Sequence, residues 1–393
     1  MIPATEFKNV VGRAGRAFID VEGLVLFPMF DRHDRRRAQW QSLIQDAAGR
    51  EMESGLVLLV NELLNRLNES LGYPGIEDLT EYVLKNAAAW SFPEVEGEGE
   101  DGEEYAQREW ARWVSNLDTA ILSLVGDNGV DADNVANSID QILGSSLWSR
   151  RLQRHEKKIR QLFQTALTSR ARYMWSNSTA AERKAYYLAG VGWSTGQRLD
   201  AIAEQANELL VDANSAILAK EEGAAIAALS GLAELAFEIS PFNPDPLPDS
   251  WRDILSAWLR GMPIADIAGQ DPTDTLRFIE DALVYRLPWA IDAIRVRALS
   301  HNDVVGGFGI DDLETSLAIP ALETGTLNIS AAILMQAGFS SRTAAIKAVA
   351  DTEANFSNTR QLTAWLSSDV VSVKSLLGDW PTSETEQLWE VCK

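Results

Sequence analysis

The spacing of apolar residues is the feature that most constrains the fold of this chain. After Arg35 they recur every three or four positions. The first such stretch includes Leu56, Leu59, Leu63 and Leu67. This is the period of an α-helix with one buried face, whereas a half-buried strand alternates apolar and polar residues. The sequence therefore predicts a mainly α-helical protein whose helices pack through their apolar sides.

Turn-forming residues divide this pattern into separate helices. Glycine and proline mark the turns, as in residues 72–75 and 190–192. The stretch 94–104, EVEGEGEDGEE, is acidic and rich in glycine, so we expect a solvated, flexible loop there. The predicted helical stretches are 38–71, 76–89, 110–125, 132–144, 146–175, 180–189, 197–219, 224–239, two or three helices within 251–299, 330–349 and 359–366.

Residues 1–30 differ from the rest of the chain. The run 24–27, between Gly23 and Pro28, is apolar throughout, which is typical of a buried strand. A single strand is not stable alone, and no later segment obviously supplies a sheet for it. We therefore expect residues 1–30 to be the end of an α/β domain whose other part lies outside this sequence.

The composition excludes several classes of protein. The 393 residues, of which 46% are hydrophobic, suffice for two or three domains with large cores. The one cysteine, Cys392, excludes a disulfide within the chain and favours a reducing, cytoplasmic compartment. The three histidines lie far apart without cysteine neighbours, so we expect no metal site. Because no run of about eighteen apolar residues occurs, we expect no membrane span.

Prolines indicate a linker in the second half of the chain. Residues 240–249, SPFNPDPLPD, contain four prolines and are the best candidate for a domain boundary. The sequence therefore predicts four regions, namely the α/β end 1–30, the helical regions 31–145 and 146–240, and a C-terminal helical region 250–393 that ends in a helical hairpin.

The segment Gly12–Arg16, with the sequence GRAGR, carries the clearest chemistry. Its two arginines are three residues apart, so they share a face if a helix begins near Gly15. A guanidinium is always charged, planar and rich in donors, which suits a transferring phosphoryl group whose charge is spread over several oxygens. The alternative is a surface turn with two solvated arginines.

The surroundings of GRAGR resemble motif VI of superfamily-2 helicases, particularly the Ski-like DExH group, whose members unwind RNA or DNA. Asn9 stands where that family has a glutamine, which is similar in hydrogen bonding but longer. The matching residues are Gly12, Arg13, Gly15 and Arg16 of the motif, Asp20 and Gly23 of the loop, and 24–27 of the last strand in the second RecA-like lobe.

The resemblance implies a role for each matching residue. Arg13 and Arg16 would be arginine fingers that reach the γ-phosphate of ATP across a cleft. In other phosphoryl-transfer enzymes, loss of such a finger lowers the rate by about 10³–10⁵-fold. The residues implied to contact the nucleotide are Asn9, Gly12, Gly15 and Asp20.

The ATP-binding half of such a motor is missing from the sequence. The dipeptide Gly-Lys does not occur, so there is no P-loop, and Asp-Glu does not occur, so there is no DExH box for magnesium. We therefore expect ATP and Mg²⁺ to be bound mainly by the missing N-terminal helicase half, from the same gene or a separate chain. This chain alone is then expected to be inactive.

Three later segments are similar to the helical C-terminal region of these helicases, namely 183–199, 255–267 and 274–287. Leucine and tryptophan at helical spacing are usually core residues, so these segments support a fold and not a site. The implied fold is a remnant of a RecA-like lobe followed by winged-helix-like and helical-bundle domains. Region 31–145 would be winged-helix-like, and region 146–240 a helical domain with a basic helix.

The basic helix is the second candidate site. On one helix, Arg150, Arg154, Lys157 and Lys158 would line one side, with Arg151 beside them. Such a stripe can follow the phosphates of DNA or RNA, while aromatic residues stack on bases. The flanking aromatic residues are Trp148, Tyr173 and Trp175. The alternative is a solvated helix, or one neutralised by the acidic bulk of a chain whose net charge is −22.

A helical hairpin is expected over residues 329–349, with a turn at Gly338 and an N-cap at Ser340–Ser341. It is compatible with a helix-turn-helix module in which Arg342 and Lys347 face outward. Plain packing units of this shape are more common.

Two functions remain open at this point. The chain is either the C-terminal part of an ATP-dependent nucleic-acid helicase, with arginine fingers and strand-gripping helical domains, or a non-enzymatic helical scaffold or partner-binding subunit derived from one. The sequence does not separate DNA from RNA as the substrate.

Overall fold

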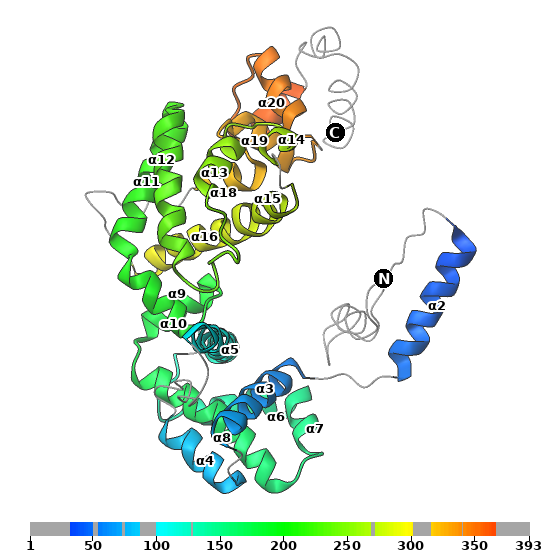
Figure 1. The fold of residues 1–393 in the computed structure, drawn as a ribbon, viewed down its shortest axis with the longest axis vertical. Helices are drawn as coiled ribbons and strands as arrows, with labels where there is room; N and C mark the ends of the chain where they lie inside the picture. Colours follow the sequence, from blue (N-terminus) through cyan, green and yellow to red (C-terminus); the bar gives the residue numbers. More distant parts are fainter. Residues whose placement is uncertain are drawn as a thin grey trace. The chain divides into compact units, whose positions relative to one another are not determined.

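The computed structural model describes residues 32–49, 54–72, 75–86, 100–126, 129–268, 272–301, 316–339 and 341–366. These ranges are mainly helical and contain no strand, which confirms the mainly α-helical prediction (Figure 1). The GRAGR segment, Asn9, Asp20 and the expected strand 24–27 lie outside the described residues.

Contacts divide the chain into two compact units. Unit 1 comprises the described residues within 1–103 and 131–173, and unit 2 those within 104–130 and 174–393. The proline-rich segment 240–249, expected at a boundary, lies inside unit 2. The helices of unit 1 are α2 (His33–Gly49), α3 (Gly55–Ser70), α4 (Ile76–Lys85), α6 (Val135–Gly144), α7 (Leu147–Leu152) and most of α8 (Lys157–Ser176).

The core of unit 1 begins with α3. The Ser54 hydroxyl caps this helix by accepting a hydrogen bond from the backbone N of Val57 at 3.4 Å. Leu63 and Leu67, which the sequence placed on one helical face, are both buried, and α3 contacts α7. Each fully buried leucine stabilises the fold by about 1.5–3 kcal/mol.

The single helix expected over 146–175 is wrong, because the structure has two helices there. α7 ends at Leu152, and α8 begins at Lys157. Residues 153–156 are all polar, so they offer no apolar side chain that would hold a continuous helix against the core. Instead, the backbone N of His155 donates to the carbonyl oxygen of Leu152 at 3.0 Å, a tight turn that ends α7.

The acidic loop expected over 94–104 is wrong at its C-terminal end. Helix α5 (Glu100–Val125) already begins at Glu100, and residues 94–99 lie outside the described ranges. Acidic residues are favourable in the first turn of a helix, where they meet the partial positive charge of the helix start. The predicted helix 110–125 is confirmed as part of α5.

Unit 2 contains most of α5 and a series of packed helices. α11 and α12 form a hairpin that turns at Lys220, and α16 packs on α9. The helices after α5 are α9 (Ala180–Ala189), α10 (Trp193–Ala201), α11 (Ala203–Ala219), α12 (Glu222–Phe237), α13 (Trp251–Leu259), α14 (Ile264–Ala268), α15 (Pro272–Phe278), the π-helix η1 (Ile279–Arg286), α16 (Leu287–His301), α18 (Ala318–Thr324), α19 (Ile329–Gln336), α20 (Arg342–Asp351) and α21 (Thr359–Leu366).

The segments α15, η1 and α16 follow one another without an intervening turn, so residues 272–301 form a continuous helical segment. Inside it, Arg286 forms an ion pair with Asp281 at 2.7 Å and donates a hydrogen bond to the backbone oxygen of Asn243. These contacts fix the proline-rich segment 240–249 to the π-helix.

The terminal hairpin is a packing unit with its own core. The Ser341 hydroxyl caps α20, as expected, by accepting a hydrogen bond from the backbone N of Ala344. The outward orientation expected for Arg342 is wrong, because this residue is only 8% exposed. Its guanidinium lies 4.0 Å from the ring centroid of Trp258 and donates to the backbone oxygen of Met262. Burial lowers the pKa of Arg342 to about 10, so the side chain stays charged at neutral pH.

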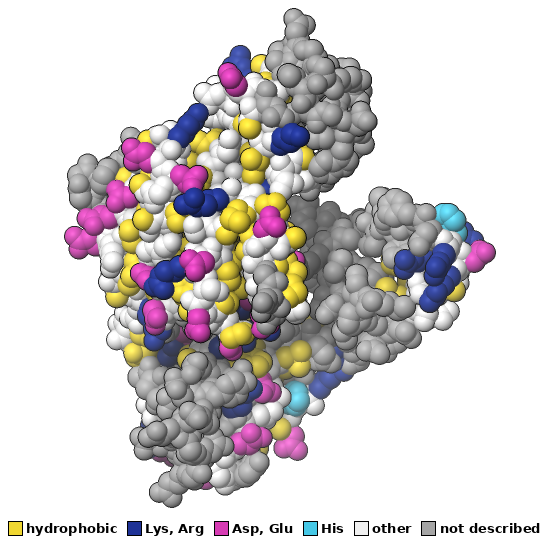
Figure 2. All heavy atoms as spheres, turned by 45° about the horizontal axis from the view of Figure 1, so that its top comes forward, with side chains coloured by type: hydrophobic (Ala, Val, Ile, Leu, Met, Phe, Trp, Pro, Cys, Tyr) yellow, Lys and Arg dark blue, Asp and Glu magenta, His cyan; other side chains and the backbone are white. Residues whose placement is uncertain are grey.

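Several exposed cations of unit 2 lie in ion pairs with carboxylates. Figure 2 shows Lys and Arg side chains beside Asp and Glu side chains on the face in view. Arg260 lies 3.0 Å from Glu222, and Arg295 lies 2.7 Å from Asp292. The partners of such surface pairs neutralise each other locally, although each pair contributes little stability.

No single described helix is both long enough and apolar enough to cross a membrane. α18 and α19 meet these two conditions only when taken together, and they are bent by 65° relative to each other.

A close contact between Gly196 and Tyr186 joins α10 to α9. The buried Tyr186 hydroxyl donates to Oδ2 of Asp200, and Nε of Arg297 on α16 donates to Oδ1. Burial, and then the hydrogen bond and charge of Asp200, raise the pKa of Tyr186. A Cβ atom on Gly196 would lie 2.4 Å from Cδ1 of the Tyr186 ring, which is held by its hydroxyl.

Substitution Gly196→Ala is therefore expected to destabilise unit 2 by about 1–3 kcal/mol, because the added methyl overpacks the contact. The control is Gly223→Ala on α12, where an added Cβ meets nothing within 4 Å. That change is expected to be neutral or to stabilise by up to about 1 kcal/mol. Thermal unfolding followed by circular dichroism measures both, and equal midpoints would contradict the close contact.

Asn207 on α11 is fully buried, and neither polar atom of its amide has a hydrogen-bond partner among the described residues. An unsatisfied buried amide costs about 1–3 kcal/mol. Asn214, two turns later, instead accepts a hydrogen bond from the backbone N of Leu317 at 2.9 Å.

We expect Asn207→Leu to raise the thermal midpoint, because leucine has the same number of heavy side-chain atoms and no polar group to satisfy. Asn214→Leu is the matched control and is expected to lower the midpoint, since it leaves the N–H of Leu317 without that acceptor. Two changes of the same sign and size would show that the two amides do not differ in this way.

Candidate functional site

The residues expected to contact nucleic acid lie on three successive pieces of unit 1. α7 carries Trp148, Arg150 and Arg151, the following turn carries Arg154, and the first turn of α8 carries Lys157 and Lys158. Because a turn separates the two helices, these residues do not form a stripe along one helix. The expected stripe is therefore wrong, whereas the clustering of positive charge in this part of unit 1 remains.

Two of these residues are buried, namely Trp148 and Arg151, which are 4% and 8% exposed. Together with Leu152 they occupy one face of α7, at spacings of three and four residues. The Trp148 ring packs against the ring of Phe163 on α8, with centroids 6.2 Å apart. The spacing of Trp148 and Leu152 is the signal that identifies this face as buried.

The sequence predicted aromatic residues that could stack on bases, but the two tryptophans do not lie on an open surface. Trp175 is also buried, and its Nε1 donates to the carbonyl oxygen of Val130 at 2.7 Å. The half-buried Tyr173 has the guanidinium of Arg170 at 5.4 Å from its ring centroid. The two tryptophans are therefore core residues, as tryptophans at helical spacing usually are.

The exposed cations differ in how far they are neutralised. Lys158 forms an ion pair with Glu77 of α4, with Nζ and Oε1 2.8 Å apart. The hydrogen bond and charge of Lys158 lower the pKa of Glu77, and those of Glu77 raise the pKa of Lys158. Arg150, Arg154 and Lys157 are exposed. Lys158 is therefore less suited to binding an anion than Lys157, which has no ion pair among the described residues.

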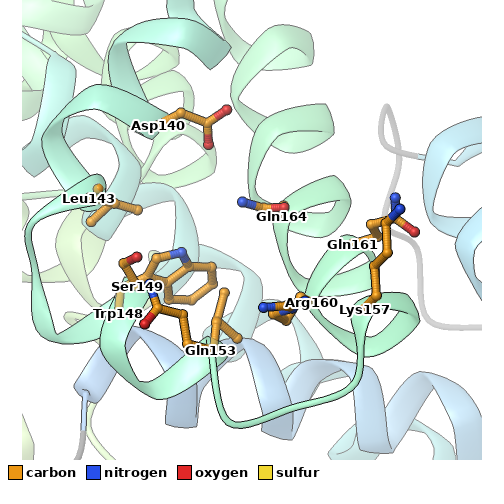
Figure 3. Close-up of a pocket in the computed structure, with 11 residues that line it drawn as sticks. Asp140, Leu143, Trp148, Ser149, Gln153, Lys157, Arg160, Gln161 and Gln164 are labelled. Atoms are coloured by element: carbon orange, nitrogen blue, oxygen red, sulfur yellow. The ribbon is translucent and has the colours of Figure 1, made fainter.

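A pocket of about 330 Å³ opens between α6, α7 and α8 (Figure 3). We name it the α6–α8 pocket. Its lining consists of Asp140, Leu143 and Gly144 of α6, Trp148, Ser149 and Leu152 of α7, Gln153 of the turn, and Lys157, Arg160, Gln161 and Gln164 of α8. Of the residues singled out for nucleic acid, Trp148 and Lys157 line this pocket.

Arg160, Gln161 and Gln164 line this pocket and were not predicted as site residues, although the sequence contains a signal for them. Lys157, Arg160, Gln161 and Gln164 follow one another at helical spacing, so they form one polar face of α8. Figure 3 shows the side chains of Arg160 and Gln164 pointing from α8 toward the space beside Trp148. A helical face that combines cations and amides is thus placed over an apolar wall.

The polar groups of the pocket are available to a ligand. Neither Lys157 nor Arg160 forms an ion pair among the described residues. The amides of Gln153, Gln161 and Gln164 have no side-chain hydrogen bonds within the same ranges. These groups offer several donors and acceptors to one small molecule.

A carboxylate lies on the other side of this pocket. Asp140 comes from α6, opposite the polar face of α8. Burial raises the pKa of Asp140, and the nearby charge of Arg172 acts in the opposite direction. The pocket therefore has a cationic side and an anionic side.

A second pocket has polar groups that are already hydrogen-bonded within the protein. A pocket of about 230 Å³ in unit 2 is lined partly by Asn328 and Ser330. Asn328 caps α19, and the Ser330 hydroxyl exchanges hydrogen bonds with the backbone of Phe356. The described ranges hold no group of three or more histidine, cysteine or carboxylate side chains that fits a metal ion.

Comparison with known proteins assigns no family to this chain. No protein-family model matches it, and no curated protein matches its sequence. The features that bear on function are the GRAGR segment and the charged surface and pocket of unit 1.

Proposed function

We propose that this chain is the C-terminal part of an ATP-dependent nucleic-acid helicase, which is active only together with an ATP-binding lobe. Residues 1–30 would be the end of a RecA-like lobe, residues 31–145 a winged-helix-like region, and the remaining helical domains would grip the strand. Arg13 and Arg16 would act on ATP and Mg²⁺ held mainly by the other lobe, and the motor would act on DNA or RNA.

The observation that carries the proposal is the GRAGR segment with its flanking residues. Two guanidiniums three residues apart match the distributed charge of a transferring phosphoryl group. Glycine at positions 12 and 15 permits a close approach of the backbone to a neighbour or a phosphate. Neither property is needed in a chain that only packs helices.

The exposed cations of unit 1 support the strand-gripping part of the proposal. The exposed side chains of Arg150, Arg154 and Lys157 occur within a short stretch of an otherwise acidic chain. Phosphate contacts supply most of the affinity of sequence-independent nucleic-acid binding. A local basic surface is sufficient for this purpose, since exposed charges further away than about 10 Å are screened at ordinary ionic strength.

A helical scaffold or partner-binding subunit is the second candidate. Leu188 of α9 and Tyr285 of η1 are 50% and 64% exposed. Tyrosine is enriched at the centre of protein–protein interfaces, so the exposed Tyr285 fits a partner-binding surface. This function predicts protein partners and no dependence of any activity on Arg13 or Arg16.

Replacing Arg13 or Arg16 by alanine in the complete helicase is expected to lower nucleic-acid-stimulated ATP hydrolysis by about 10³–10⁵-fold, because the charge on the transferring phosphoryl group loses its partner. Release of phosphate at saturating ATP measures the rate. The control is Arg35→Ala in the exposed first turn of α2, which should leave the rate unchanged. Unchanged hydrolysis in both finger variants would favour the scaffold.

The combined variant Arg150→Ala, Arg154→Ala and Lys157→Ala is expected to weaken binding of single-stranded DNA or RNA. The slope of log affinity against log salt should fall by about 0.7 for each phosphate that the variant no longer neutralises. Fluorescence anisotropy with labelled strands of both kinds measures affinity and slope.

The matched control for this variant removes three exposed cations from other places, namely Lys85, Arg252 and Lys347. It changes the net charge by the same amount and should have a much smaller effect. If both variants lose affinity equally, binding depends on total charge and not on this surface.

A further inference from the structure

The α6–α8 pocket has the dimensions of a site for a small molecule. Its volume of about 330 Å³ lies at the lower end of the range of roughly 300–1,000 Å³ that is typical of ligand sites. A pocket of this size accommodates one nucleotide unit and not a longer stretch of strand.

One side of the pocket suits a phosphate. Lys157 and Arg160 lie in the first turn of α8, a helix of 20 residues, and neither is paired among the described residues. The free N–H groups and partial positive charge at a helix start favour an anion there. An arginine fork adds two parallel hydrogen bonds to phosphate oxygens, which a lysine alone does not.

The opposite side suits the edge of a base. An ionised carboxylate such as Asp140 accepts hydrogen bonds from an exocyclic amine, as on cytosine or adenine. The same charge repels a phosphate, so it allows one orientation of the ligand and opposes the reverse. The amides of Gln161 and Gln164 lie on α8 along the same pocket and provide both donors and acceptors.

An apolar wall completes the pocket. Leu143 of α6 and Trp148 and Leu152 of α7 line it, and all three side chains are buried. The faces of a base and a sugar are largely apolar and gain from contact with such a wall. The chemical groups of the pocket are thus arranged in the same order as the parts of a nucleotide. The cations suit the phosphate, the apolar wall suits the sugar and the face of the base, and the carboxylate suits the edge of the base.

We infer that the α6–α8 pocket binds one phosphorylated nucleotide, with its phosphate at Lys157 and Arg160 and its base toward Asp140. The inference rests on the proposed function for the source of the ligand, which is the phosphorylated end of a DNA or RNA strand. A free nucleoside monophosphate has the same chemistry and is the other source.

The test measures binding to the full chain with five probes. Three are a 12-nucleotide strand with a 5′-phosphate, the same strand with a 5′-hydroxyl and the strand with a 3′-phosphate, and two are competitors, cytidine monophosphate and uridine monophosphate. We expect one phosphorylated end to bind at least about tenfold more tightly than the hydroxyl end, since tenfold is the lower end of the effect of one charge-assisted hydrogen bond. The monophosphate should compete for this difference.

The variants separate the two sides of the pocket. Arg160→Gln should reduce the preference for the phosphorylated end several-fold, to the part that Lys157 alone supplies. Asp140→Asn should keep that preference but reduce discrimination between cytidine and uridine monophosphate. Lys158→Gln removes the same charge from a residue that does not line the pocket and should change neither. Circular dichroism melting shows whether each variant remains folded.

The outcomes distinguish this inference from the proposed function. Strand binding with no preference for a phosphorylated end, and without competition by the monophosphate, overturns the inference and leaves the helicase proposal standing. Binding of the monophosphate without binding of strands supports the pocket as a free-nucleotide site and contradicts strand gripping. A preference that is undiminished in folded Arg160→Gln also overturns the inference.

Discussion

The contact between Trp148 and Phe163 holds α7 beside α8, and the walls of the α6–α8 pocket depend on it. In the sequence, Trp148 precedes a short polar turn and Phe163 follows it. His155 in that turn stacks on the same Phe163 ring, with centroids 6.1 Å apart. Aromatic pairs of this kind contribute about 0.5–1.5 kcal/mol beyond the area that they bury. Because α7 is folded back in this way, its residues form one wall of the α6–α8 pocket and the start of α8 forms another.

The arginines of this chain have two different uses. Arg342 stacks on Trp258, and Arg183 lies 4.7 Å from the ring centroid of Trp175 while donating to the backbone oxygen of Ser178. Such arginines connect helices through ring faces and carbonyl oxygens, and burial lowers the pKa of both. The number of basic residues in the sequence therefore overstates the charge that the surface offers to phosphate. Arg150 at the end of α7 and Lys157 at the start of α8 are exposed and belong to the smaller group of cations that the surface offers.

The sequence predicted the bounds of a helix correctly where local residues mark its start and its end. The helices at 180–189 and 359–366 have the predicted bounds, and the first of these is fixed by a capping box between Thr179 and Glu182. The break at 153–156 has a local signal in four successive polar residues, whereas the burial of Arg342 depends on contacts with distant residues, which spacing along the chain does not reveal. Lys157 and Trp148 were predicted as site residues from the local cluster of positive charge, whereas the place of Arg160 in a pocket depends on α6 and α7, which supply the opposite walls.

The π-helix η1 determines which side of α16 faces its neighbours. Nε1 of Trp289 donates to the last carbonyl of α9 at 3.2 Å, and Arg297 reaches Asp200 of α10. Each residue advances an α-helix by about 100°. Shortening η1 by one residue would therefore rotate α16 about its axis by more than a quarter turn and carry both side chains away from their acceptors. The winding of η1 thus sets the rotation of α16 and, with it, the contacts of α16 with α9 and α10.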